Sequence, residues 1–241
     1  WAADLQFEVR QVGVDVESLD DVDWLFWVGC AGAFEDRAKK TSQAVAELLH
    51  SAGVSFAVLG DGETCTGDPA RRSGNEFLYQ QLALQNVEVL RESRATKVVV
   101  TCAHCFNALK NEYPQLGLHL DVVHHTQLLN RLVRDGRLTP VAPADGSVAG
   151  RTVTYHDPCY LGRHNQVYEP PREVLSALPG IELKEMFFNR QNARCCGAGG
   201  GYAWMDDAPE TRINHTRIED VKASGATTAA VACPFCLQMF D

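Results

Sequence analysis

The sequence predicts an α/β protein made of two tandem, pseudo-symmetric units, each a small, mainly parallel sheet flanked by helices. Two observations predict this class. Short β-prone runs alternate with helical stretches, an order that is typical of three-layer α/β units. The nine cysteines also recur at matching spacings in the two halves of the 241-residue chain, and self-similarity of this kind indicates an internal duplication.

The cysteines define the two repeats. The first set is spaced by 35 and then 37 positions and ends in a CxxC pair: Cys30, Cys65, Cys102 and Cys105. The second set follows the same plan with one additional cysteine: Cys159, Cys195, Cys196, Cys233 and Cys236. We therefore expect a first domain over residues 22–135, a linker rich in glycine and proline over 136–150, and a second domain over 151–241.

The expected strands each lead into a cysteine. They are apolar or β-prone runs bounded by turn residues, as buried parallel strands are: Trp24–Val28, Lys97–Thr101, Val153–Tyr155 and Ala229–Ala232. Helices are expected over 37–52 and 75–92 and from Asp207 to Gly225. The first would place Thr41, Val45, Leu48, Leu49 and Ala52 on one face and end at Gly53; the third would begin with Asp207 as its N-cap and Glu210 three residues later.

This layout brings the cysteines together. Parallel sheets bind ligands at the carboxyl ends of their strands, so the cysteines of each unit should converge on one edge of its sheet. In the second unit, four glycines follow the adjacent pair and would let the backbone bend and present N–H groups to anionic sulfur: Gly197, Gly199, Gly200 and Gly201. Five thiolates exceed the four ligands of structural zinc and suit an iron–sulfur cluster.

The pattern of the second unit, C-x35-CC-x36-CPFC from Cys159 to Cys236, resembles the cysteine-rich CCG domain. That family includes the heterodisulfide reductase catalytic subunit and the iron–sulfur subunits of glycolate, lactate and glycerol-3-phosphate oxidation. The stretches CTGDPARRSGNE, HDPCYLGRHN and RCCGAGGG are similar to membrane-associated iron–sulfur reductases that take electrons from electron-transfer flavoprotein. The resemblance implies a noncubane [4Fe-4S] cluster on the five second-unit cysteines.

The first repeat departs from this pattern. Aligned on the downstream spacing, Cys65 stands opposite Cys196, and Thr64 stands where Cys195 does. Four thiolates remain, which could hold an ordinary [4Fe-4S] cluster, or the site could be empty. The two centres are therefore expected to differ.

The expected function is electron transfer from electron-transfer flavoprotein, another flavoprotein or ferredoxin-type clusters to an acceptor, by resemblance membrane quinone. The alternatives are a disulfide reductase, a glycolate or lactate oxidase subunit, and a non-catalytic scaffold that holds zinc. A net charge of −9 argues against a nucleic-acid partner. The expected location is the cytoplasmic face of a membrane, reached through ferredoxin-type and membrane segments of the same or a partner chain.

Several residues near the cysteines permit more than one interpretation. Cys102-Ala103-His104-Cys105 also matches a thioredoxin-like redox pair, although that interpretation ignores the duplication. His104 could donate a hydrogen bond to cluster sulfur or be a solvated loop residue. His156 and Asp157 could support the second site or merely form a turn. The pair Arg71-Arg72 could be solvated, or could meet an acidic partner or an anionic cofactor. Phe187, Phe188 and Trp204 are expected in the core.

Overall fold

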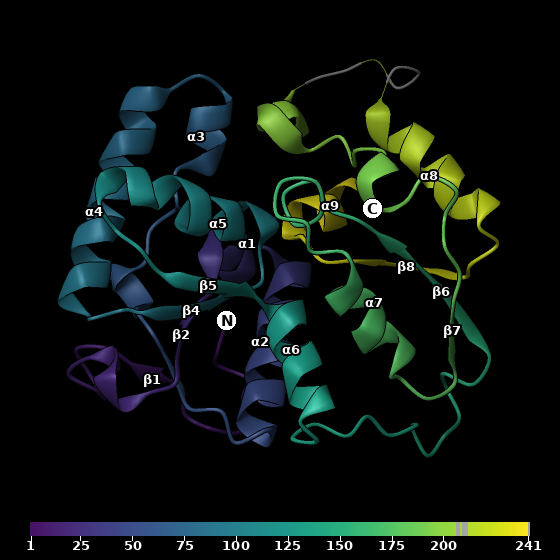
Figure 1. Cartoon of the computed structure of the whole chain (residues 1–241), viewed down its shortest axis with the longest axis horizontal. Helices are drawn as coiled ribbons and strands as arrows, with labels where there is room; N and C mark the ends of the chain where they lie inside the picture. The colour runs from purple at the N-terminus through teal and green to yellow at the C-terminus, as the bar shows by residue number, and fades with distance from the viewer. Residues whose placement is uncertain (206–207, 209–211, 241) are drawn as a thin grey trace.

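The computed structural model describes residues 1–205, 208 and 212–240, and these form two parallel sheets with helices packed against them (Figure 1). The first sheet has the order β1-β3-β2-β4-β5, and the second has the order β7-β6-β8. Every pairing within each sheet is parallel, so the predicted class is confirmed. The strands, in chain order, are β1 (Arg10–Gln11), β2 (Trp24–Trp27), β3 (Phe56–Val58), β4 (Lys97–Val100), β5 (Asp121–His124), β6 (Arg151–His156), β7 (Ile181–Leu183) and β8 (Thr228–Val231).

Helices connect the parallel strands and cover the sheets. The α-helices, in chain order, are α1 (Gly29–Phe34), α2 (Asp36–Ser51), α3 (Asp68–Arg72), α4 (Glu76–Glu92), α5 (Ala103–Asn107), α6 (His125–Arg134), α7 (Glu169–Ser176), α8 (Ile213–Ala223) and α9 (Pro234–Met239). A π-helical turn (Ala108–Glu112) and a 3-10 helix (Tyr113–Leu116) extend α5, and a further 3-10 helix covers Gly199–Trp204. Shorter 3-10 turns cover Leu19–Asp21, Gly60–Gly62 and Arg190–Asn192.

The predicted elements are present, with small differences. Helix α2 ends before Gly53, whose φ of +66° favours glycine. Its buried face is rotated from the expected one: Thr41 and Leu48 are exposed, whereas Ser42 and Ala46 are buried. Helix α8 ends before Gly225 as expected, while its predicted cap at Asp207 and Glu210 lies outside the described residues.

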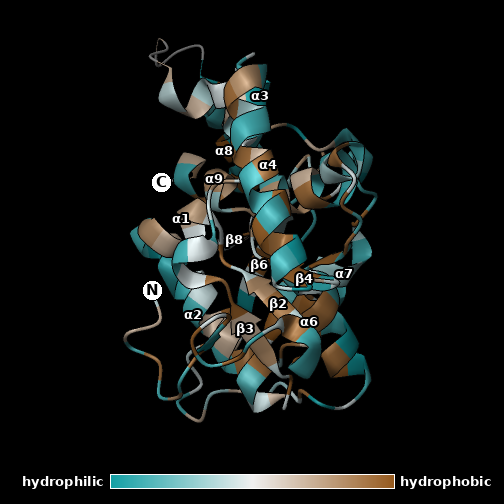
Figure 2. Cartoon of the chain, turned by 90° about the vertical axis from the view of Figure 1, so that its left-hand side faces the viewer, coloured by the Kyte–Doolittle hydropathy of each residue, from teal (hydrophilic) through white to brown (hydrophobic). Residues whose placement is uncertain are grey.

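The side chains of each strand alternate between the two faces of the first sheet, and both faces are buried. Leu25 and Trp27 belong to a hydrophobic cluster on one face, and Phe26 belongs to a second cluster on the other face, against α2 and α6. The strands are largely hydrophobic, whereas α4 mixes hydrophilic and hydrophobic residues (Figure 2). The first cluster continues into the second unit through Tyr155 and Leu161.

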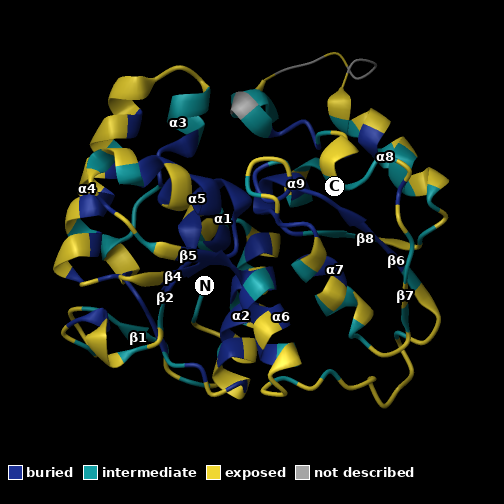
Figure 3. Cartoon of the chain, in the orientation of Figure 1, coloured by how far each residue is buried: buried dark blue, intermediate teal, exposed yellow. Residues whose placement is uncertain are grey.

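The two units pack closely together. Helix α6 contacts α7, and α9 contacts α1 and α2. Buried residues gather where α1, α5 and α9 meet (Figure 3). Residues 135–150, all of them described, contain no helix or strand and join α6 to β6. None of the described helices is long and apolar enough to span a membrane.

Candidate metal centres

All nine cysteines are free thiols placed just beyond the carboxyl ends of the strands or in the loops that meet there. In the first unit, Cys30 lies in α1 after β2, and Cys102 follows β4. In the second unit, Cys159 follows β6, and Cys233 follows β8 as the N-cap of α9. We call Cys30, Cys65, Cys102 and Cys105 the first centre, and Cys159, Cys195, Cys196, Cys233 and Cys236 the second centre.

In the first centre, the sulfur of Cys65 is a hydrogen-bond acceptor. It accepts from the thiol of Cys30 and from the backbone N–H of Gly67 at 3.5 Å. These hydrogen bonds, that of Cys30 above all, lower the pKa of Cys65 to about 6. Cys102 donates to Cys105, which also accepts from the hydroxyl of Thr66 at 3.9 Å. The four sulfurs are therefore linked through direct contacts in pairs.

In the second centre, Cys195 is the equivalent acceptor. Its sulfur accepts from the thiols of Cys159 and Cys196 and from the backbone N–H of Gly197 at 3.2 Å. The hydrogen bond from Cys159 is the largest cause that lowers the pKa of Cys195, to about 2. The thiol of Cys236 lies within hydrogen-bonding reach of the sulfurs of both Cys196 and Cys233. The five thiols form one connected group.

These contacts correct the alignment of the two repeats. Cys65 and Cys195 each accept an N–H from the residue two positions later, Gly67 or Gly197, and both glycines have positive φ, +82° and +92°. Cys65 therefore matches Cys195, and Thr66 stands where Cys196 does; the predicted match between Thr64 and Cys195 is wrong. The cysteine spacing predicted the wrong match because the second unit has one more residue than the first between this turn and its CxxC pair.

The two centres adjoin each other. The thiol of Cys102 in the first centre also lies within hydrogen-bonding reach of Cys233 in the second, and both residues are buried. Burial raises the pKa of Cys233, but hydrogen bonds from Cys102, Cys236 and His104 outweigh burial and lower it well below the usual value. The sulfur contact crosses between the two units, so the edges of the two sheets share one group of thiols.

The side chain of His104, in the first unit, also contacts residues of the second unit. Its Nδ1–H donates to the buried carboxylate of Asp68 at 2.6 Å, and its side chain also donates to Cys233. Burial lowers the pKa of His104, but Asp68 and Cys233 outweigh burial and raise it to about 10. The ring packs against Tyr160 and Phe235 of the second unit, with centroids 4.8 and 4.7 Å away. His104 is therefore not a solvated loop residue.

The pair Arg71-Arg72 is accounted for within the chain. Arg72 pairs with Asp68 at 3.1 Å, and both arginines pair with Glu112, Arg71 at 3.0 Å. This network holds α3 against the turn that follows α5. None of the interpretations drawn from the sequence, a solvated face, an acidic partner or an anionic cofactor, is needed to explain the pair.

Comparison with known proteins decides the family. The model of the cysteine-rich domain, CCG, matches residues 24–110 and again residues 153–241. The chain belongs to the CCG family. The first match covers β2, β3, β4 and the first centre, and the second covers most of the second sheet and the second centre. The tandem arrangement predicted from the cysteine spacing is therefore confirmed.

Curated relatives agree with this family. The chain is 45% identical, over 91% of its length, to a probable iron-sulfur-binding oxidoreductase FadF of Bacillus subtilis. It is 43% identical over 91% to an EtfAB:quinone oxidoreductase of Syntrophomonas wolfei, and 37% identical over 98% to a subunit of the dihydromethanophenazine:CoB–CoM heterodisulfide reductase of Methanosarcina barkeri. These alignments span 30%, 31% and 58% of the relatives. The predicted class, an iron–sulfur oxidoreductase module, is confirmed, and its cofactor is of the iron–sulfur kind.

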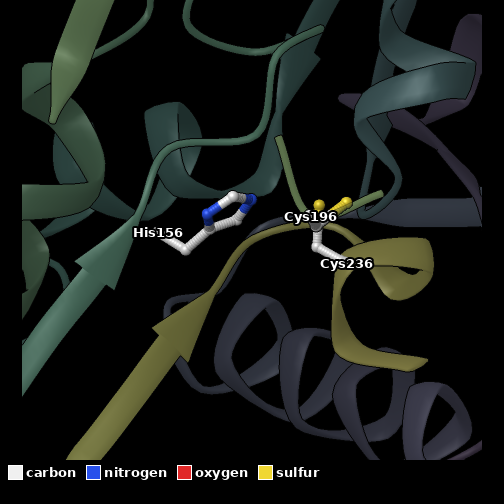
Figure 4. Close-up of side chains that lie close together, drawn as sticks. All are labelled: His156, Cys196 and Cys236. Atoms are coloured by element: carbon white, nitrogen blue, oxygen red, sulfur yellow. The ribbon is translucent and has the colours of Figure 1, made fainter. Parts of the chain in front are cut away.

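His156 adjoins the second CCG centre. One of its ring nitrogens and the sulfurs of Cys196 and Cys236 all lie within 4.8 Å of one another (Figure 4). Arg217, which is fully buried, donates its Nε–H to Nδ1 of His156 at 3.0 Å. Burial, followed by the charge of Arg217, lowers the pKa of His156 to about 4. Its neighbour Asp157 instead pairs with Arg172, at 2.7 and 2.9 Å.

The glycine run of the second CCG domain is not uniform. Gly197 and Gly201 have positive φ, whereas Gly199 does not. A Cβ at Gly197 would lie 3.3 Å from Cε of Met239 and 3.4 Å from the backbone nitrogen of Asn214, while one at Gly199 would meet nothing within 4 Å. The bend after the two cysteines therefore depends on Gly197, and the expectation that Gly199 supplies the same freedom is wrong.

The donor set fits an iron–sulfur group. Within each CCG domain the thiols converge at a largely buried edge, and backbone N–H groups point at Cys65 and Cys195. Nε2 of His156 is buried beside the second centre without a partner among the described residues. A fifth thiol and an unpaired donor exceed what tetrahedral zinc requires.

Three residues that support the two centres were not predicted from the sequence. Arg217 and Asp68 orient the two histidines from distant parts of the chain, and Glu63 accepts the N–H groups of Val28 and Gly29 at 3.1 and 2.5 Å, where β2 joins α1. No spacing rule points to them. Phe187 and Trp204, expected in the core, are 90% and 64% exposed.

Proposed function

We propose that this chain is the CCG module of an electron-transfer oxidoreductase, which accepts electrons from electron-transfer flavoprotein or ferredoxin-type clusters and delivers them to membrane quinone. The observation that carries the proposal is the contact between Cys102 and Cys233, which joins the two centres through buried sulfur. Two adjoining centres provide a continuous route from one unit to the other, which electron transfer requires and a structural scaffold does not.

The five cysteines of the second centre would hold a [4Fe-4S] cluster of the noncubane type, and the four of the first would hold an ordinary [4Fe-4S] cluster. The backbone of the loop at Gly197, Gly199 and Gly200 would lie beside the second cluster. Such a group supplies one-electron transfer when it is bound. The chain's own contribution is to bind it, to exclude water and to present N–H groups to its sulfur.

The partners follow from the relatives' names. FadF is named a probable iron-sulfur-binding oxidoreductase, another relative is named an EtfAB:quinone oxidoreductase, and a third, from Chromohalobacter salexigens, is named a probable membrane-anchored ferredoxin. These names support a flavoprotein donor, a quinone acceptor and an association with a membrane through segments beyond the two CCG domains. We place the module at the cytoplasmic face of that membrane.

A transfer assay tests this function. Protein purified under argon would be mixed with reduced electron-transfer flavoprotein and a water-soluble quinone, and loss of visible cluster absorption and quinone reduction would be followed together. We expect both in the wild type. Cys196→Thr, which copies Thr66 of the first centre into the second, should retain reduction by the flavoprotein and lose quinone reduction. Equal quinone reduction by the two proteins would contradict the proposal.

Disulfide reduction is the second candidate function. A cavity of about 460 Å³ adjoins the first centre and is lined by Cys30, Cys65 and Glu63 among others. Cys30 is exposed and donates to the sulfur of Cys65, whose pKa is lowered, so a small substrate could reach this pair. A heterodisulfide reductase component is also among the relatives. Reoxidation of the reduced protein by a small disulfide, but not by quinone, would favour this function over quinone reduction.

A further inference from the structure

The ring of His156 lies at the edge of the second centre, and its two nitrogens have different surroundings. Nδ1 lies 3.0 Å from Nε of Arg217. Nε2 is buried and has no hydrogen-bond partner among the described residues. Figure 4 shows the ring extending from the end of β6 toward the sulfurs of Cys196 and Cys236. An imidazole in this position could act either as a metal ligand or as a hydrogen-bond donor.

Arg217 decides between these two roles. A guanidinium group has only donors and does not lose its proton in proteins. Its Nε–H therefore donates to Nδ1 of His156, and Nδ1 must be the acceptor. In a neutral imidazole the proton then resides on Nε2. A protonated Nε2 has no lone pair in the ring plane to offer a metal, but it is a hydrogen-bond donor.

The position of Arg217 is itself held firmly. Its Nη1 donates to the backbone oxygen of Phe188 at 2.8 Å and to the carboxylate of Asp220 at 3.0 Å. The other oxygen of Asp220 accepts from Arg194 at 3.0 Å. The single negative charge of Asp220 is thus shared by two positively charged arginines. The side of the second centre next to Arg217 therefore has an excess of positive charge, which favours an anionic cluster.

We propose that His156 is a hydrogen-bond donor to sulfur of the second centre, and not one of its ligands, and that Arg217 is the positioning residue that fixes the donating nitrogen. The inference rests on the proposed iron–sulfur centre. The acceptor is a cluster sulfide or a ligating thiolate beside Cys196 and Cys236. Hydrogen bonds to cluster sulfur stabilise the more negative, reduced state and raise the reduction potential.

Three substitutions test the role of His156. His156→Phe removes the donor with little change in volume, His156→Gln retains an N–H, and His164→Phe removes an exposed histidine of the same unit as the matched control. Iron and sulfide content, the midpoint potential of the second centre, and proton and nitrogen couplings by electron-nuclear double resonance in H₂O and D₂O would be measured for each.

We expect the wild type to show an exchangeable proton coupled to the second centre. His156→Phe should lose that proton and shift the potential to a more negative value with iron and sulfide unchanged, His156→Gln should restore both in large part, and His164→Phe should match the wild type. A strong imidazole nitrogen coupling in the wild type, or the lack of any exchangeable proton, would overturn the inference alone. A wild type without iron and sulfide would overturn the proposed function as well.

Discussion

The bend at Gly197 gives the sharpest test of how the second centre is built. Its φ of +92° lies in the left-handed region, where a Cβ costs about 1–2 kcal/mol. That Cβ would also meet Met239 at 3.3 Å and the backbone nitrogen of Asn214 at 3.4 Å, and crowding of a packed site costs about 1–3 kcal/mol. Gly197→Ala should therefore lower the free energy of unfolding by about 2–5 kcal/mol.

Gly199→Ala is the matched control, because it adds the same methyl group two residues later, where φ is not positive and nothing lies within 4 Å. It should change the free energy of unfolding by less than about 0.5 kcal/mol. Urea denaturation of the cluster-free proteins measures both changes, and iron per chain after reconstitution measures assembly. We expect reduced iron loading only in Gly197→Ala. Equal stability and equal iron in the two variants would refute the account of the bend.

Three other substitutions probe the centres and their supports. Thr66→Cys adds a fifth thiol beside Cys105 and should alter the paramagnetic resonance of the first centre without altering the second; an unchanged spectrum would argue against this geometry. Arg172→Met removes the ion-pair partner of the buried carboxylate of Asp157, which still accepts the backbone N–H of Arg190, and should destabilise the fold by about 3–5 kcal/mol. Asp157→Asn should restore part of this loss in the double variant, and full stability of the single variant in urea would contradict the prediction. Burial lowers the pKa of His124 from 6.5 to about 4, so the neutral ring stabilises the fold above pH 6.5. About 3 kcal/mol of the free energy of unfolding is lost as the pH falls from 6.5 to 4. His124→Gln should reduce this dependence of stability on pH, and an identical dependence in the variant would contradict the prediction.

The cysteine spacing predicted the tandem α/β plan because each cysteine follows a strand and parallel strands end at a common edge. It also predicted that the cysteines of each unit converge, but it did not predict that Cys102 meets Cys233 across the two units. The strands β1, β3, β5 and β7 were missed because each has only two to four residues and none of them leads directly into a cysteine. The register error at Cys65 arose because a spacing cannot show where the extra residue of the second unit lies, whereas the N–H of Gly67 shows it directly.

The supporting side chains could not be predicted, for a different reason. Asp68 lies 36 positions from His104, and Arg217 lies 61 positions from His156. Each pair forms only because two elements meet across the packed units. The sequence predicted that His104 and His156 could assist the centres; it could not identify the residues that orient them or show that His104 reaches Cys233 of the other unit.

Iron, zinc and acid-labile sulfide content of protein purified under argon tests the central claim most directly. The five connected thiols of the second centre predict about four irons with matching sulfide in that unit, and Cys195→Ala should remove the signal of that centre while leaving the first. Stoichiometric zinc without sulfide, or cluster signals unchanged by Cys195→Ala, would contradict the account.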